Sequence, residues 1–92
     1  MTKATMTTAF KSLDELRQDA AVLRLQRTNL HVVEILEKLE DRLADDPDAN
    51  SIRIACSFNQ SYVDEILGML RRSGYSVERI GSGEVFSLKF FV

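Results

Sequence analysis

The fold of this 92-residue chain is decided by the stretch Ser12–Asp48, which reads SLDELRQDAAVLRLQRTNLHVVEILEKLEDRLADDPD. Ser12, followed three residues later by Glu15, forms a capping box in which each side chain can bond the other residue's backbone amide. Pro47 disfavours a helical conformation for the residue before it. Because no Gly or Pro lies between these signals, the sequence predicts one long helix over residues 12–45. The alternative is a break near Thr28 and Asn29, with one of them capping a second helix.

The apolar residues of this helix form two stripes with alternating steps of three and four, the spacing of a buried helix face. Leu30 ends the first stripe and Val32 belongs to the second, about 200° further around the axis, so the stripes face nearly opposite directions. We expect the second to cover the chain's own sheet and the first to mediate self-association. The first stripe comprises Leu13, Leu16, Ala20, Leu23, Arg27 and Leu30. The second comprises Val22, Leu25, Asn29, Val32, Leu36, Leu39 and Leu43.

The charges of the helix are also divided between its two halves. Residues 1–31 have five basic and three acidic side chains, a net charge of +2, whereas residues 32–50 have two basic and seven acidic ones, a net charge of −5. Antiparallel pairing of two such helices would set the basic half of one against the acidic half of the other. Each exposed pair contributes little stability, but charge patterns can fix orientation. The simplest assembly is therefore an antiparallel homodimer.

Downstream of the helix, the pattern predicts a β-α-β-β unit over residues 52–92. Residues 52–58 alternate apolar and polar side chains, as a half-buried strand does. A second helix over residues 62–72 has a cap signal at Ser61 and ends at Gly74 in a Schellman motif. Strands over residues 75–80 and 84–92 follow, joined by the turn Gly81-Ser82-Gly83.

The predicted fold class is α+β, with the long helix followed by a three-stranded sheet. The strand over residues 84–92 is the most apolar, so we place it centrally and antiparallel to both neighbours, which gives the strand order 1-3-2. We expect an N-terminal arm over residues 1–11 and a single domain over residues 12–92.

Composition excludes several classes of protein. The net charge of −2 gives no general attraction to nucleic acid or anionic membranes. No apolar run approaches the ~20 residues that a membrane span needs, and the first ten residues lack the apolar core of a signal peptide. A single cysteine excludes an internal disulfide framework and fits a reducing cytosol. We expect a cytoplasmic protein with no membrane partner.

The residues that could support catalysis or bind metal lack the necessary surroundings. His31 lies in mid-helix, and Cys56 lies on the apolar face of a strand, where a thiol is usually a small core residue. Neither has a second Cys or His at metal-ligand spacing. Their separation in the sequence does not exclude that Cys56 and His31 form a nucleophile pair in the fold, although a buried thiol lacks the activation that a nucleophile needs. The acidic run Asp45–Asp48 lacks a calcium-loop pattern. We expect no enzyme activity, no metal and no cofactor.

One basic surface offers an alternative function. Basic groups beside an aromatic ring on a sheet can bind single-stranded nucleic acid. The competing interpretation is that the two arginines at the end of the second helix complement its C-terminal dipole and that the strand residues keep the sheet soluble. The candidate residues are Arg53, Arg71, Arg72, Lys89 and Phe91.

The αβαββ order resembles that of small uncharacterised proteins encoded by bacteriophages. The residues that carry the resemblance make the fold and cover roughly half of the chain: Ile52–Phe58, Tyr62–Arg72, Gly74–Val77 and Phe86–Phe90. The resemblance carries no catalytic residue over. It implies a viral accessory, assembly or host-defence-blocking protein in the host cytoplasm. Together these observations predict a non-catalytic, self-associating protein that binds another protein, with a small nucleic-acid-binding module as the alternative.

Overall fold

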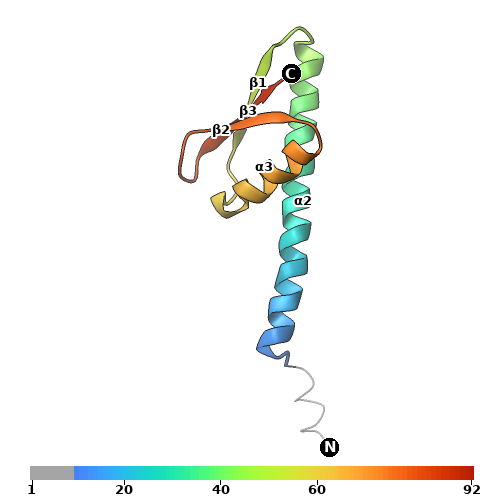
Figure 1. Cartoon of the computed structure of the whole chain (residues 1–92), viewed down its shortest axis with the longest axis vertical. Helices are drawn as coiled ribbons and strands as arrows, with labels where there is room; N and C mark the ends of the chain where they lie inside the picture. Colours follow the sequence, from blue (N-terminus) through green and yellow to red (C-terminus); the bar gives the residue numbers. More distant parts are fainter. Residues whose placement is uncertain (1–9) are drawn as a thin grey trace, which may run out of the picture.

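A computed structural model describes residues 10–92 and has the predicted α+β architecture (Figure 1). The long helix comes first, and a short 3₁₀ turn precedes the second helix. The predicted N-terminal arm lies outside the described residues except for Phe10 and Lys11. In chain order the elements are α2 (Leu13–Asp45), β1 (Ser51–Cys56), η1 (Gln60–Tyr62), α3 (Val63–Arg72), β2 (Ser76–Ile80) and β3 (Phe86–Phe91).

Helix α2 runs without a break through Thr28 and Asn29, and its 33 residues span about 50 Å. At its start, the Ser12 hydroxyl oxygen accepts a hydrogen bond from the Glu15 amide at 3.2 Å, which is one of the two bonds of the predicted capping box. At its end, the Asp46 amide donates to the Arg42 carbonyl, and Pro47 follows. The start and stop signals in the sequence therefore give the helix boundaries to within one residue.

The sheet has the strand order β1-β3-β2, which confirms the prediction of order 1-3-2. β3 pairs antiparallel with both neighbours, so that Leu88 lies opposite Ile54 and Phe90 lies opposite Val77. These inward-facing residues are buried, while their chain neighbours on β1 face solvent. The strands are one to three residues shorter than predicted, and Phe58 and Val85 lie in loops.

One face of the sheet is covered by the helices, and the core lies between them. α3 packs against α2 and β2, and the C-terminal half of α2 packs against β1. The other face of the sheet carries the exposed residues of β1 and β2 and is not covered by a described element. The buried apolar residues are Ile35, Leu39, Ile52, Ile54, Cys56, Tyr62, Val63, Ile66, Leu67, Leu70, Val77, Phe86, Leu88 and Phe90.

The start of α3 differs from the prediction. The Ser61 side chain does not cap the helix, because the 3₁₀ turn is inserted first and the Asn59 side chain accepts from the Ser61 amide at 2.9 Å. The end of α3 is as predicted. Gly74 has a φ of 98°, and the Tyr75 amide donates to the Leu70 carbonyl at 3.0 Å, as in a Schellman motif.

The N-terminal half of α2 extends beyond the sheet and α3 (Figure 1). Every residue of the helix from Leu13 to Leu23 is exposed, and the first half-buried residue is Arg24. The first fully buried one is Thr28. The helix therefore consists of a protruding segment, residues 13–23, and a packed segment, residues 24–45.

Candidate self-association surface

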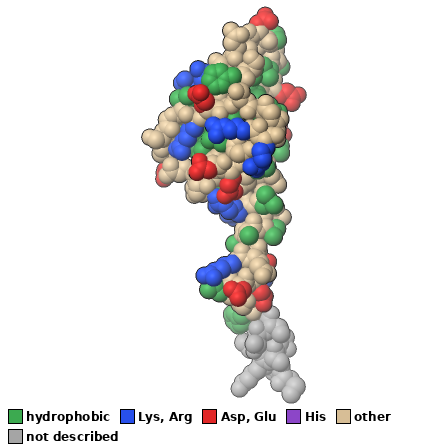
Figure 2. Space-filling view, viewed as in Figure 1, with side chains coloured by type: hydrophobic (Ala, Val, Ile, Leu, Met, Phe, Trp, Pro, Cys, Tyr) green, Lys and Arg blue, Asp and Glu red, His purple; other side chains and the backbone are tan. Residues whose placement is uncertain are grey.

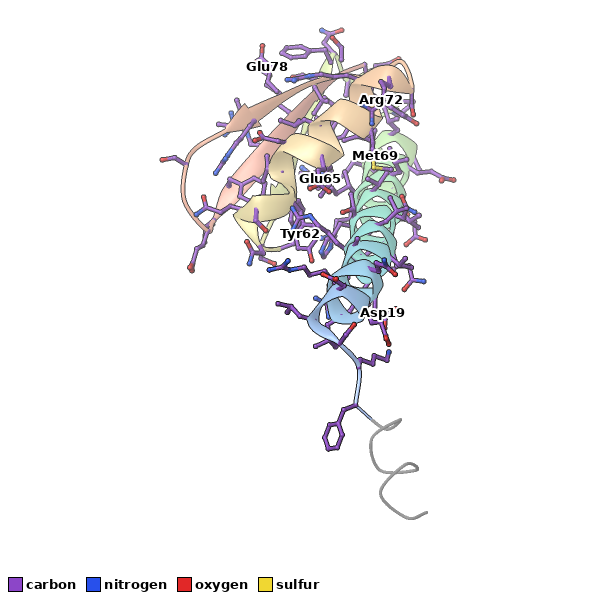
Figure 3. All side chains as sticks on the ribbon, turned by 60° about the horizontal axis from the view of Figure 1, so that its bottom comes forward. Asp19, Tyr62, Glu65, Met69, Arg72 and Glu78 are labelled. Carbon is purple, nitrogen blue, oxygen red and sulfur yellow. The ribbon has the colours of Figure 1, made fainter. Side chains whose placement is uncertain are left out.

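The protruding segment begins where an arginine of α2 is held by α3. Arg24 donates to a carboxylate oxygen of Glu65 through Nε at 2.8 Å, and to the Ser61 carbonyl through Nη2 at 2.7 Å. Its guanidinium also lies over the Tyr62 ring, 4.5 Å from the centroid. Figure 3 shows Tyr62 and Glu65 in the region between α3 and α2, and Asp19 further along α2, beyond α3. These contacts fix the direction in which the helix leaves the domain.

Thr28 completes this junction and is the one fully buried polar residue among the described ones. Its hydroxyl donates to the Arg24 carbonyl at 2.9 Å and lies 3.3 Å from the second Glu65 oxygen. Bonding back to the preceding turn satisfies a helical threonine without breaking the helix. The sequence treats Thr28 only as a candidate break, because Glu65 is 37 residues away. The only sequence feature that could have predicted this buried contact is a single threonine in a helix that has no Gly or Pro.

The first stripe is exposed along its whole length in the described chain. The first stripe is not part of the core, because its leucines are largely exposed: Leu13 61%, Leu16 51%, Leu23 44% and Leu30 56%. Ala20 and Arg27 are exposed as well. In the space-filling view, hydrophobic side chains lie along the narrow part of the molecule formed by α2 (Figure 2). The stripe is therefore one line of side chains that residues 10–92 of this chain leave uncovered.

The second stripe covers the sheet only in its later part. Leu39 is buried, and Val32, Leu36 and Leu43 are partly buried against the core, as predicted. Val22, Leu25 and Asn29 are exposed. Leu25 lines a shallow pocket beside Met69 and Arg72 of α3 but is not buried by it. The buried line instead runs through Thr28, Ile35 and Leu39. Thr28 and Ile35 belong to neither predicted stripe.

The predicted basic surface divides between the two sides of the sheet. Arg53 lies directly opposite Lys89 on the exposed face, and the Lys89 ammonium lies 5.2 Å from the Phe91 ring centroid. Glu78 lies on the other side of Lys89 in the same row. Arg71 and Arg72 belong to α3 on the opposite, helix-covered side, where Arg71 donates to the Val77 carbonyl at 3.0 Å. The structure therefore brings together three of the five residues and adds an acidic neighbour.

His31 and Cys56 line one cavity of about 240 Å³ between α2 and the end of β1. The His31 ring stacks on Phe58, with centroids 4.7 Å apart, and meets the edge of Tyr62. Burial raises the pKa of the Cys56 thiol, against a smaller lowering influence of Lys38, and its sulfur contacts the Ile54 carbonyl at 3.5 Å. A raised pKa keeps the thiol protonated, which is the opposite of what a nucleophilic cysteine needs.

Among residues 10–92 no three His, Cys, Asp or Glu side chains are grouped so that they could hold a metal ion. The acidic residues after α2 are exposed around the loop at Pro47. None of the described helices is long and apolar enough to cross a membrane. Comparison of the chain with protein-family models, with curated proteins and with solved structures found no match.

Proposed function

We propose that this chain is a non-catalytic binding protein that self-associates through the first stripe of α2. The observation that carries the proposal is the exposure of four leucines along one line of α2, three of which lie in the segment that protrudes from its own domain. Contiguous exposed apolar surface of this kind is typical of protein–protein interfaces. Burying it is favourable by about 25 cal/mol per Å² of apolar area. A second copy of the chain is the simplest partner, because every copy carries the same exposed stripe.

The charge pattern supports an antiparallel arrangement of the two copies. The acidic residues of α2 are concentrated after Val33, and in a parallel pair they would lie beside one another. Arg24 is already paired with Glu65 of its own chain, so it adds little to this preference. Lys11 is likewise paired with Asp19. Orientation therefore depends on the acidic half and on Arg27.

The surroundings of His31 and Cys56 support a non-catalytic role. The imidazole stacks on the Phe58 ring and makes an edge contact with Tyr62, and burial raises the pKa of the Cys56 thiol. A self-associated binding protein would use its remaining exposed surfaces for another macromolecule, most simply another protein. A phage accessory, assembly or host-defence-blocking role belongs to this same proposal.

A small nucleic-acid-binding module is the second candidate. It is favoured by the adjacency of Arg53, Lys89 and Phe91 on the uncovered sheet face. It is weakened by Glu78 in the same row, which reduces the positive potential there. We rank it below self-association because three clustered side chains make a smaller surface than the stripe.

The experiment that tests the proposal compares two double variants of α2. Leu16→Asp/Leu23→Asp places charge in the stripe, and we expect a monomer with the helix and sheet retained in circular dichroism. Val22→Asp/Leu25→Asp is the matched control, because these residues are 58% and 59% exposed but lie outside the stripe. Size-exclusion chromatography with light scattering gives the mass. Equal behaviour of both variants would contradict an interface on the stripe.

A further inference from the structure

The stripe has the same spacing when it is followed from either end. Its six positions, 13, 16, 20, 23, 27 and 30, are separated by steps of three, four, three, four and three residues. When two such helices lie antiparallel, residue 13 faces 30, residue 16 faces 27, and residue 20 faces 23. All three pairings share one centre, midway between Ala21 and Val22. The stripe is therefore self-complementary, which is the requirement for a two-fold interface in which both copies use the same surface.

We propose that two copies pair antiparallel about this centre, an inference that rests on the self-association proposed above. Leu13 then packs against the partner's Leu30, Ala20 against the partner's Leu23, and Leu16 against the partner's Arg27. Alternating steps of three and four are the seam of an antiparallel coiled coil. Beyond Leu30 the seam continues at Glu34, Glu37 and Asp41. The apolar overlap ends where the acidic residues begin.

Other alignments of the same seam are less favourable. A parallel pair sets Arg27 against the partner's Arg27 and Glu34 against the partner's Glu34. An antiparallel pair shifted by one heptad toward the acidic half sets Leu13 against the partner's Glu37 and Leu16 against the partner's Glu34. A shift by one heptad in the other direction leaves Arg27 and Leu30 without any leucine opposite them. Among antiparallel registers, only the centred one buries all four leucines of the seam against residues of the stripe. A parallel pair also buries them, each against the same leucine of the partner, but it sets like charges against each other at Arg27 and Glu34.

Arg27 is the residue that selects this register. Among residues 10–92 it has no ion-pair partner, whereas Arg24 is held by Glu65. In the centred register its aliphatic stem lies on the partner's Leu16. The partner's Asp19, which also pairs with Lys11 of its own chain, is one helical turn further along, on the flank of the seam. Arginine can bury its stem on apolar surface while its guanidinium bonds a carboxylate. A single polar residue at such a seam specifies orientation at some cost in affinity.

The domains leave room for this pairing. Arg27 of the stripe and Thr28 of the buried line are adjacent in the sequence, so the two lines are about 100° apart around the axis of α2. A second helix packed on the stripe therefore lies beside the domain and does not overlap it. The packed segment is centred near Ile35, which is ~20 Å along the axis from the centre of the pair at ~1.5 Å per residue. The two α+β units then lie at opposite ends of the helix pair, ~40 Å apart, each with its sheet face uncovered.

Double electron–electron resonance, which measures the distance between two spin labels, tests this geometry on the full chain. In a Cys56→Ala background, a nitroxide on Glu40→Cys labels an exposed position ~28 Å from the proposed centre. The expected distance between the two labels is ~55 Å for the centred antiparallel pair and below ~20 Å for a parallel one. A dimer with the short distance overturns the proposed geometry and leaves self-association standing, whereas a monomer overturns both.

Two arginine substitutions in the same labelled chain test the role of Arg27. With Arg27→Leu, we expect dimers that include a second population with the short distance, because all six stripe positions are then apolar and only the acidic residues beyond Leu30 still oppose the parallel orientation. Arg17→Leu is the matched control, since this arginine is exposed in the protruding segment but lies off the seam. It is expected to keep the long distance alone. A single long distance for Arg27→Leu would overturn its role in selecting the register.

Discussion

Arg24 and Glu65 are 41 residues apart in the sequence, and their ion pair marks the point at which α2 leaves the domain. The same carboxylate also meets the Thr28 hydroxyl, so one α3 side chain contacts two successive turns of α2. On the N-terminal side of this pair every helix residue is exposed, and on the C-terminal side the helix is packed. The pair thus holds the packed segment in place and lets the stripe extend beyond it.

Replacing Glu65 by Gln is expected to lower the free energy of unfolding by about 0.5–1 kcal/mol. The two side chains are 40% and 46% exposed, so solvent screens the pair and limits the loss. Urea unfolding at low and high salt measures the effect, which should shrink as salt rises. Asp64→Asn, at the neighbouring exposed position of α3, is the control. An equal loss in both variants would assign the effect to helix charge rather than to Arg24.

Replacing Gly68 by Ala is expected to stabilise the protein by up to ~1 kcal/mol, because Gly is unfavourable in a helix interior. The sequence suggests that this glycine allows a close approach to α2 or the sheet. In the structure an added Cβ would meet only the guanidinium of Arg72, at 3.4 Å, and that side chain can move. Gly74→Ala should instead destabilise, because its φ of 98° strains any residue with a Cβ. Thermal unfolding of both variants decides the matter, and a destabilised Gly68→Ala would mean that α3 is packed too tightly for a methyl group.

His31 and Cys56 are expected to be dispensable for self-association. Cys56→Ala leaves a small cavity, and His31→Ala loses stacking on Phe58 worth roughly 0.5–1.5 kcal/mol. Both variants should unfold more easily yet remain dimers when folded. A folded variant that loses the biological effect of the protein would contradict the non-catalytic interpretation.

Stability should fall at alkaline pH through Cys56. Burial raises the pKa of this thiol in the folded chain, so the unfolded chain loses the proton first, at pH above about 8.5. The contribution of the protonated thiol is complete below that pH and is lost as pH rises through the folded-state pKa. Urea midpoints between neutral and alkaline pH should decline less for Cys56→Ala than for the unmodified chain. Parallel declines would show that the thiol is not responsible.

The uncovered sheet face is expected not to bind nucleic acid. Fluorescence anisotropy with a labelled mixed-sequence single strand at low salt should give no saturable binding, since Glu78 lies beside Lys89. Should binding occur, Arg53→Ala/Lys89→Ala locates it, and Arg72→Ala on the other side of the sheet is the control. Saturable binding lost only in the double variant would promote the nucleic-acid module to first place.

The sequence predicted most of the fold because its signals are local. Each signal acts within a few residues: the cap at Ser12, the stop at Pro47, the alternating pattern that begins at Ile52, and the left-handed conformation of Gly74. The central place of β3 followed from its apolar content on both faces. Local signals did not identify Asn59 as the cap before α3, since Ser61 has a capping pattern and its carbonyl is instead bonded by Arg24.

The candidate surface was only partly predictable, because sequence signals are local and exposure depends on contacts between distant segments. The stripe is visible as a spacing, but its exposure depends on where α3 ends along α2, and this is a tertiary property. The buried roles of Thr28 and Ile35 and the stacking of His31 on Phe58 also depend on contacts between distant segments. The division of the basic residues between two sides of the sheet required knowing on which face α3 packs.

Sedimentation velocity of the unmodified chain tests the central claim most directly. Residues 10–92 of the chain leave the four leucines of the stripe exposed, so we expect a species of twice the chain mass at tens of micromolar, dissociating on dilution. A monomer throughout that range, with the stripe still exposed, would contradict self-association and remove the basis for the proposed pairing.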